Sequence, residues 1–272
     1  HDLLDNCYRA FFLHLLPALG FEAPASPHLD PELLAGYRER NPAARDLPTL
    51  FVTSDLPFLA TESIDAFLAQ APPDVEVAMG MVDHRALEQV REALREKTAL
   101  DSWKLGFLPL YEAPVRLNNL FLVRPLRIEP FNYTLLHKLY AHRWLLQRDG
   151  SLHARNWWDM GRAMIGYACK AAGKWRVLRA VSNFIPAVFA MVLARLTQRV
   201  GRWLSWPFRL FLRKRDMEFI GSTMFAVRGY LLVSSDPRPA FDIDVEDSYT
   251  SLVRDNEREY TEIQRYLDAR DD

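Results

Sequence analysis

The chain has 272 residues, of which 49% are hydrophobic and 25% are charged. This composition is typical of a globular protein, and it excludes a disordered tail, a collagen-like fibre and a disulfide-stabilised scaffold. The two cysteines, Cys7 and Cys169, are too few for a disulfide framework and lack the spacing of metal ligands. They favour a reducing compartment, and so we expect a cytoplasmic protein.

The first half of the chain predicts strands that alternate with helices. Short apolar runs rich in β-forming residues, bounded by turn residues, predict three strands, within 47–57 and over 75–81 and 119–123. Apolar side chains at helical spacing predict helices within the first twenty residues, over 31–40, from Thr61 onward with Thr61 as its N-cap, and over 85–97. This alternation is typical of an α/β sheet with crossover connections.

The character of the sequence changes between residues 130 and 215. This segment holds sixteen Lys and Arg against two acids, and it contains six of the seven tryptophans. The rest of the chain has 18 basic and 33 acidic residues. We interpret 130–215 as a mostly helical basic insertion into an α/β core formed by 1–129 and 216–272, which ends with a strand over 226–234 and a helix over 249–267.

Asp55 directly follows a predicted buried strand and is the leading candidate for chemistry. In an open α/β sheet, ligands bind outside the carboxyl ends of the strands, and Mg²⁺ prefers carboxylate oxygens as ligands. Asp242 and Asp244 lie two apart on an extended segment, so they face the same side, and one of them could complete a metal site with Asp55. The alternative is that Asp55 caps the following turn and that 242–247 is a solvated loop.

Three motifs occur in the order found in MobA-like nucleotidyltransferases. Leu50–Phe67 resembles the central motif of that group, in which a strand ends in SDxP before a turn and a helix. Phe241–Tyr249 resembles the second motif, an Asn/Asp–aliphatic–Asn/Asp triplet, and Arg116–Arg124 resembles the segment that lines the acceptor pocket. The resemblance covers most of the chain outside the basic insertion.

This resemblance implies a Rossmann-like, GT-A-type α/β/α sandwich that binds a nucleoside triphosphate and Mg²⁺. It implies transfer of a nucleotidyl group to a phosphate- or phosphonate-bearing acceptor, which is small or lipid-linked, with release of pyrophosphate. By matching position, Asp55 is implied as the first metal ligand and Asp244, with Asp242, as the second. The residues implied to bind substrate are Ser54, Arg116, Asn118 and Asn119. A glycosyltransferase-like or non-catalytic protein of the same fold is the alternative.

The sequence departs from the family in one respect. The family begins with a strand and a Gly-rich loop of the type L-A-G-G-x-x-x-R-M, in which backbone N–H groups hold phosphates. No such loop occurs in this sequence, which begins with His1, and Asp2–Asn6 resembles a part of the family that follows two strands. We expect the loop to precede this chain, the alternative being a degenerate member, and we expect the chain alone to catalyse nucleotidyl transfer poorly.

The basic insertion predicts contact with an anionic membrane. Residues 195–215 alternate Arg with Leu, Trp and Phe and contain no acid, a pattern that suits a membrane interface. The expected contact residues are Trp203, Trp206, Arg209 and Arg213. An equally weighted alternative is a helical subdomain whose arginines meet the acidic remainder of the chain, and nucleic acid is the least favoured partner. The uncharged run 180–194 is shorter than a membrane span and contains Pro186.

Overall fold

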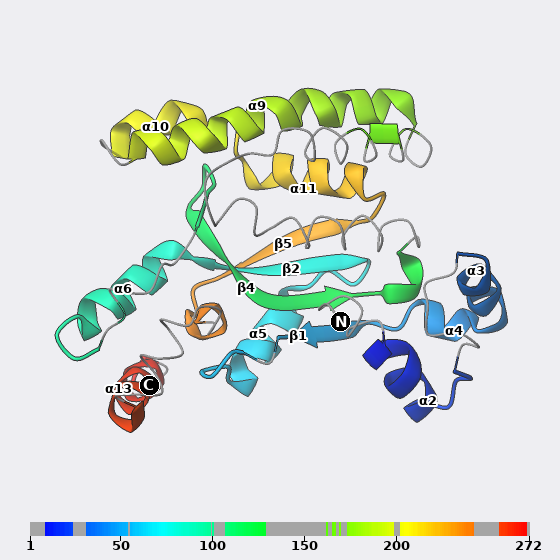
Figure 1. Cartoon of the computed structure of the whole chain (residues 1–272), viewed down its shortest axis with the longest axis horizontal. Coiled ribbons are helices and arrows are strands. Elements are labelled where there is room, and N and C mark those ends of the chain that lie inside the picture. The colour runs from blue at the N-terminus through cyan, green and yellow to red at the C-terminus, as the bar shows by residue number, and fades with distance from the viewer. Residues whose placement is uncertain are drawn as a thin grey trace.

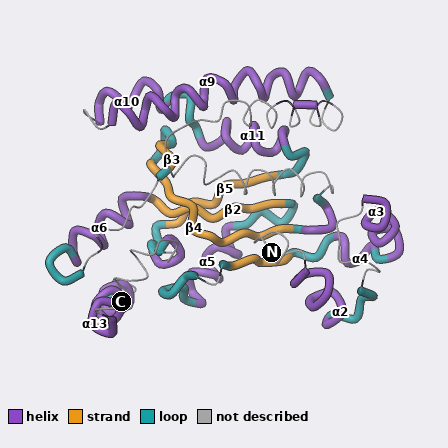
Figure 2. The backbone as a smooth tube through the Cα atoms, viewed as in Figure 1, coloured by secondary structure: helices purple, strands orange, loops and turns teal. Residues whose placement is uncertain are grey.

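The structure is a computed structural model, and it describes residues 9–23, 31–53, 55–98, 100, 107–128, 162, 165–166, 169, 173–198, 202–241 and 256–270. A five-stranded mixed sheet lies at its centre (Figures 1 and 2). Four strands follow one another in the order β1-β4-β2-β5, and β3 pairs with the start of β4. The strands are β1 (Thr49–Val52), β2 (Val77–Asp83), β3 (Leu108–Pro109), β4 (Pro114–Val123) and β5 (Gly229–Ser234).

The directions of the strands create two unlike edges. Strand β4 runs antiparallel to both β1 and β2, and β2 runs parallel to β5. Strands β1, β2 and β5 therefore point the same way. Their carboxyl ends lie at the same end of the sheet, together with the beginning of β4, and we call this end the carboxyl edge. In sheets of this kind that edge is where ligands bind.

Helices surround the sheet. They are the π-helical turn η1 (Ala10–Leu15), α2 (Leu16–Ala18), α3 (Pro31–Arg40), α4 (Pro42–Arg45), α5 (Thr61–Gln70), α6 (His84–Leu94), α9 (Lys174–Gln198), α10 (Arg202–Arg209), α11 (Lys214–Met224) and α13 (Asn256–Asp268), with 3-10 turns η3 (Pro125–Arg127) and η5 (Arg238–Ala240). The predicted α/β class is confirmed. The helical character predicted for the insertion holds for α9 and α10, while the domain boundaries at 130 and 215 stay predictions.

Helices α6 and α5 begin in different ways. Asp83 ends β2 and caps α6, because its carboxylate accepts a hydrogen bond of 2.9 Å from the backbone N–H of Arg85. The prediction that Thr61 is the N-cap of α5 was wrong. Ala60 occupies that position in extended backbone without a side-chain hydrogen bond, and Thr61 is the first helical residue.

The buried side chains form separate clusters around the sheet. Phe67 of α5 packs against one face of the sheet, with side chains from β2, β4 and β5. Beside the sheet, α6 and α13 pack on one another through Leu87 and Val90 on α6 and Ile263 and Leu267 on α13, all of them fully buried. This packing fixes α13 close to the carboxyl edge, where α6 begins.

Helix α11 covers the outer edge of β5. The Glu218 carboxylate accepts a 2.9 Å hydrogen bond from the N–H of Leu231, and the Ser222 hydroxyl accepts one of 3.0 Å from the N–H of Gly229. These contacts satisfy backbone donors on an edge that would otherwise be open to pairing with another chain. Helices α9 and α10 form a further layer beyond α11, farthest from the sheet (Figure 1).

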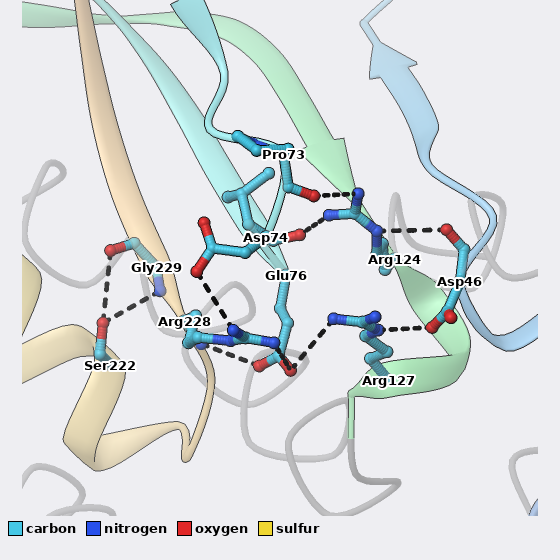
Figure 3. Close-up of polar contacts among 10 residues, drawn as sticks. Asp46, Pro73, Asp74, Glu76, Arg124, Arg127, Ser222, Arg228 and Gly229 are labelled. Carbon is cyan, nitrogen blue, oxygen red and sulfur yellow. Dashed lines mark hydrogen bonds and ion pairs between the residues drawn. The ribbon is translucent and has the colours of Figure 1, made fainter.

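Charged side chains connect the segments at the opposite end of the sheet, where β1, β2 and β5 begin and which we call the amino edge (Figure 3). Arg124 donates from its guanidinium to the backbone carbonyls of Asp46, Pro73 and Val75. Arg127 donates to the Asp46 carboxylate at 2.7 Å, and this hydrogen bond lowers the pKa of Asp46. Arginines therefore already bind the acids near this edge, and we assign these contacts a structural role.

Candidate functional site

The carboxyl edge brings together polar residues from four strands. Asp55 follows β1 by three residues, Asp83 and His84 stand where β2 passes into α6, Asp236 follows β5, and Arg116 lies near the start of β4. These residues are up to 181 positions apart in the sequence, so only the arrangement of the strands in the sheet brings them together.

Most acids at this edge are occupied by the protein itself. Asp83 caps α6, as described above. Asp236 accepts a hydrogen bond from the Ser63 hydroxyl on α5, and its second carboxylate oxygen accepts one of 3.1 Å from the N–H of Arg238. The Arg238 guanidinium lies 3.5 Å from the same oxygen. Asp236 therefore joins α5 to the turn after β5, and its contacts are structural.

Asp55 differs from these acids. One of its carboxylate oxygens, Oδ1, is buried and has no hydrogen-bond partner among the residues that the structure describes. A buried carboxylate oxygen without a donor or a cation lowers stability, and proteins keep such groups where a ligand supplies the missing contact. This unpaired oxygen, at the carboxyl edge, fits the chemistry of a metal ligand.

The chain that leads into the acidic segment 242–247 packs beside the Asp55 loop. Phe241 is fully buried, and its ring meets that of Phe58 edge to face, with 5.9 Å between the ring centroids. Phe58 stacks at 4.9 Å on Tyr260 of α13, whose hydroxyl donates to the carbonyl of Pro57 at 3.3 Å. Phe58, three residues after Asp55, and Phe241 are thus neighbours, although the sequence separates them widely.

Arg116 reinforces this arrangement. Its Nε donates a 3.0 Å hydrogen bond to the carbonyl of Ala240, next to Phe241. The guanidinium of a β4 residue therefore holds the chain that precedes Asp242. Tyr260 also borders a shallow hollow of about 460 Å³ on the surface of α13, but no residue of the Asp55 loop lines it.

The two asparagines predicted to bind substrate lie at a β-bulge. The register between β2 and β4 shifts between Met79 and Met81, and Asn119 takes a positive φ of 59°. Asn118 is only 1% exposed, and its Oδ1 accepts a 3.2 Å hydrogen bond from the N–H of Leu120. These contacts make Asn118 a structural residue of the bulge, while a substrate contact by Asn119 stays a prediction.

Several predicted site residues lie outside the described residues. These are Ser54, Asp242, Asp244 and the side chain of Trp203. Among the residues that the structure describes, no group of three His, Cys, Asp or Glu side chains could hold a metal ion. The metal site at Asp55, Asp242 and Asp244 therefore stays a prediction, although the described residues on either side of it lie together.

The predicted membrane residues divide into two kinds. Trp206 is 56% exposed, in keeping with a surface contact. Arg209 donates from Nε to the carbonyl of Leu110 at 2.8 Å, and the Arg213 guanidinium lies 5.5 Å from the ring centroid of Tyr111. These two arginines hold α10 and the start of α11 on the connection between β3 and β4, so we give them a structural role.

His84 is a half-buried titratable group at the start of α6. Its ring stacks on Phe107 at 4.7 Å, and its Nε2 lies 3.4 Å from a carboxylate oxygen of Glu88. Burial lowers the pKa of His84, with Glu88 opposing the shift and Arg91 adding to it. Its position directly after β2 places it at the carboxyl edge.

We expect His84 to make the protein less stable in mild acid. The folded-state pKa lies below that of the unfolded chain, so the unfolded state binds the proton first and stability falls as the pH drops below about 6.5. His84→Phe keeps a ring against Phe107 but cannot titrate. Its Tm should therefore fall less than that of the parent protein between about pH 7.5 and 5.5. Equal falls in Tm would contradict this account.

Comparisons with known proteins add little to this geometry. No protein-family model matches the chain, and no curated protein matches it. The chain is similar to a solved structure described as a hypothetical transferase from Thermus thermophilus, with 18% identity and a TM-score of 0.44. The match covers 79% of this chain and 68% of that one. A likeness at this level does not indicate the activity of this chain.

Proposed function

We propose that this chain carries the metal-binding and acceptor half of an Mg²⁺-dependent nucleotidyltransferase. One observation carries the proposal: the buried, unpaired carboxylate oxygen of Asp55 lies on a loop packed against the chain that runs into Asp242 and Asp244. Phe241 is covalently joined to Asp242, and Asp244 is only two residues farther on. The proposal brings the three carboxylates to one part of the carboxyl edge, which is where α/β folds of this kind bind ligands.

The residues in this proposal have separate roles. Asp55, Asp242 and Asp244 hold the cation, which neutralises charge on the phosphate oxygens of the nucleoside triphosphate. Arg116 positions the acidic segment through the carbonyl of Ala240. In the proposed reaction an acceptor oxygen bonds to the α-phosphorus of the nucleoside triphosphate, and the bond from that phosphorus to the leaving pyrophosphate breaks.

The triphosphate itself needs groups that this sequence lacks. No Gly-rich loop of the family's type occurs in it. The proposal therefore assigns to this chain the cation and the acceptor side, and the phosphate-holding loop to a separate segment. A glycosyl transfer from a nucleotide sugar would use the same carboxylates and remains the second candidate, since both reactions need a cation on a diphosphate.

The proposal predicts an unusual pair of effects for Asp55→Asn. Loss of one carboxylate should weaken the binding of Mn²⁺, used as a probe for Mg²⁺, by about tenfold or more in a calorimetric titration. In metal-free buffer the same variant should be more stable than the parent by about 1 kcal/mol, because it removes a carboxylate that has one oxygen buried without a donor. Chemical unfolding in the presence of a chelator measures this second effect.

The matched control is Asp46→Asn at the amino edge. Asp46 is also an acid beside a strand of the sheet, but its carboxylate is held by Arg127. This variant should bind Mn²⁺ as the parent does. The metal role of Asp55 is refuted if Asp55→Asn binds Mn²⁺ with the parent's affinity, and a loss of stability on that substitution would assign Asp55 to a helix or turn cap instead.

A further inference from the structure

Helix α9 has a broad apolar face that is exposed. Two adjacent rows of side chains, spaced four residues apart, form the α9 stripe, which we define as Phe184, Ile185, Val188, Phe189, Val192 and Leu193. Their exposed fractions run from 36% to 66%, with Phe189 the most exposed. Trp175, near the start of the helix, is 84% exposed. Exposed apolar side chains therefore occur from Trp175 to Leu193, along about 27 Å of the helix.

The opposite face of α9 is packed onto the protein. Ala180, Ala187, Ala190 and Ala194 are almost fully buried there, in a cluster that includes Ile220 and Met224 of α11. Small side chains at this spacing allow close packing of helices. Helix α9 is thus held along its length by α10 and α11, and it belongs to the layer farthest from the sheet (Figure 1).

Every charged residue in the sequence of α9 and α10 is basic. Residues 174–215 contain ten Lys and Arg and no acid. Lys174 and Arg176, at the start of α9, are exposed beside Trp175. An apolar face flanked by tryptophan and by cations is the pattern of helices that lie in the interface of an anionic bilayer.

We propose that the protein docks on an anionic lipid bilayer through the α9 stripe, with α9 lying in the plane of the interface. The apolar side chains enter the boundary between headgroups and acyl chains, and the flanking Lys and Arg contact anionic headgroups. This proposal moves the predicted membrane contact from Arg209 and Arg213, which are bound to the protein, to α9. It stands independently of the proposed metal site.

By length and composition alone, α9 could instead cross a membrane. The segment Lys174–Ala194 is apolar enough for this, and 28% of it is buried within the protein. Its Ala face, however, rests on α11, which carries Lys214, Arg215, Asp216 and Glu218. A spanning α9 would pull this charged helix into hydrocarbon, at a cost of several kcal/mol for each ion. An in-plane helix leaves α11 in water.

Charge also favours lipid over other occupants of the stripe. Two copies of the chain meeting through α9 would oppose two surfaces that are both basic, and like charges across an interface are unfavourable. Nucleic acid would attract the cations, but it offers no apolar phase for Ile185, Val188 and Val192. A bilayer containing anionic lipid complements both the apolar side chains and the cations.

Vesicle co-sedimentation tests the proposal. The parent protein should bind vesicles that contain about one third phosphatidylglycerol in phosphatidylcholine, and it should bind pure phosphatidylcholine much more weakly. Binding should weaken in high salt, since screening shortens the reach of the cations. Phe189→Glu and Val192→Glu, made separately, should each reduce binding about tenfold or more. Both positions are exposed, so the variants should keep the parent's Tm.

The matched control is Leu68→Glu on α5, an apolar side chain 40% exposed and far from α9 in the sequence. It should bind vesicles as the parent does. The proposal is overturned if the parent binds neither kind of vesicle, or if the α9 variants bind as well as Leu68→Glu. It is also overturned if light scattering finds a dimer that Phe189→Glu converts to a monomer, because the stripe is then a contact between copies.

Discussion

Replacing Gly80 with alanine is expected to destabilise the protein by about 2–4 kcal/mol. A Cβ at this position would lie 2.0 Å from Oδ1 of Asn118, far inside van der Waals contact. Asn118 is buried and cannot turn away without losing its hydrogen bond from the N–H of Leu120. The bulge between β2 and β4 would have to reorganise. Urea unfolding of the parent and of Gly80→Ala measures the effect.

A double variant identifies the cause. In Gly80→Ala/Asn118→Ala the colliding amide is absent, so the second substitution should recover part of the stability lost in the first. Gly221→Ala is the matched control, since a Cβ there meets nothing within 4 Å and the residue lies inside α11. It should be neutral or stabilising by up to about 1 kcal/mol. If the effects of the two substitutions at 80 and 118 on the free energy of unfolding are simply additive, the close approach of a Cβ at 80 to Asn118 is not the cause of the lost stability.

Arg124→Met should also cost about 2–4 kcal/mol. The guanidinium of Arg124 is shared among the carbonyls of Asp46, Pro73 and Val75, which belong to the segments that precede β1 and β2 (Figure 3). Methionine fills much of the same space but leaves these acceptors without a donor. Chemical unfolding monitored by circular dichroism measures the loss.

Two further variants separate geometry from charge at this edge. Arg124→Lys keeps the charge but cannot direct donors to three carbonyls in one plane, so it should recover less than half of the loss. Arg228→Met removes a 52% exposed arginine that pairs with Asp74 at 3.1 Å, and it should cost less than about 1 kcal/mol. Equal losses for Arg124→Met and Arg228→Met would show that the carbonyl contacts add nothing beyond surface charge.

The elements of the fold were largely predictable from local patterns. The strand before Asp55, the strands over 75–81 and 119–123 and the helix that Asp83 caps all occur close to their predicted positions. They were predictable because the spacing of apolar residues depends on neighbours within a few positions. The Thr61 N-cap was wrong, since capping depends on the backbone conformation of a single residue, which this spacing does not determine.

The sequence by itself determined the α/β class, the position of Asp55 after a strand and the acid-free, tryptophan-rich character of the helices near the middle of the chain. Only the tertiary structure decided which side chains remain free to act. It pairs Asp236 with Ser63, 173 residues away, and leaves an oxygen of Asp55 unpaired. It also turns the Ala face of α9 inward and its Phe and Val side chains outward. These outcomes depend on contacts between distant segments, and such contacts leave no periodic signal in the sequence.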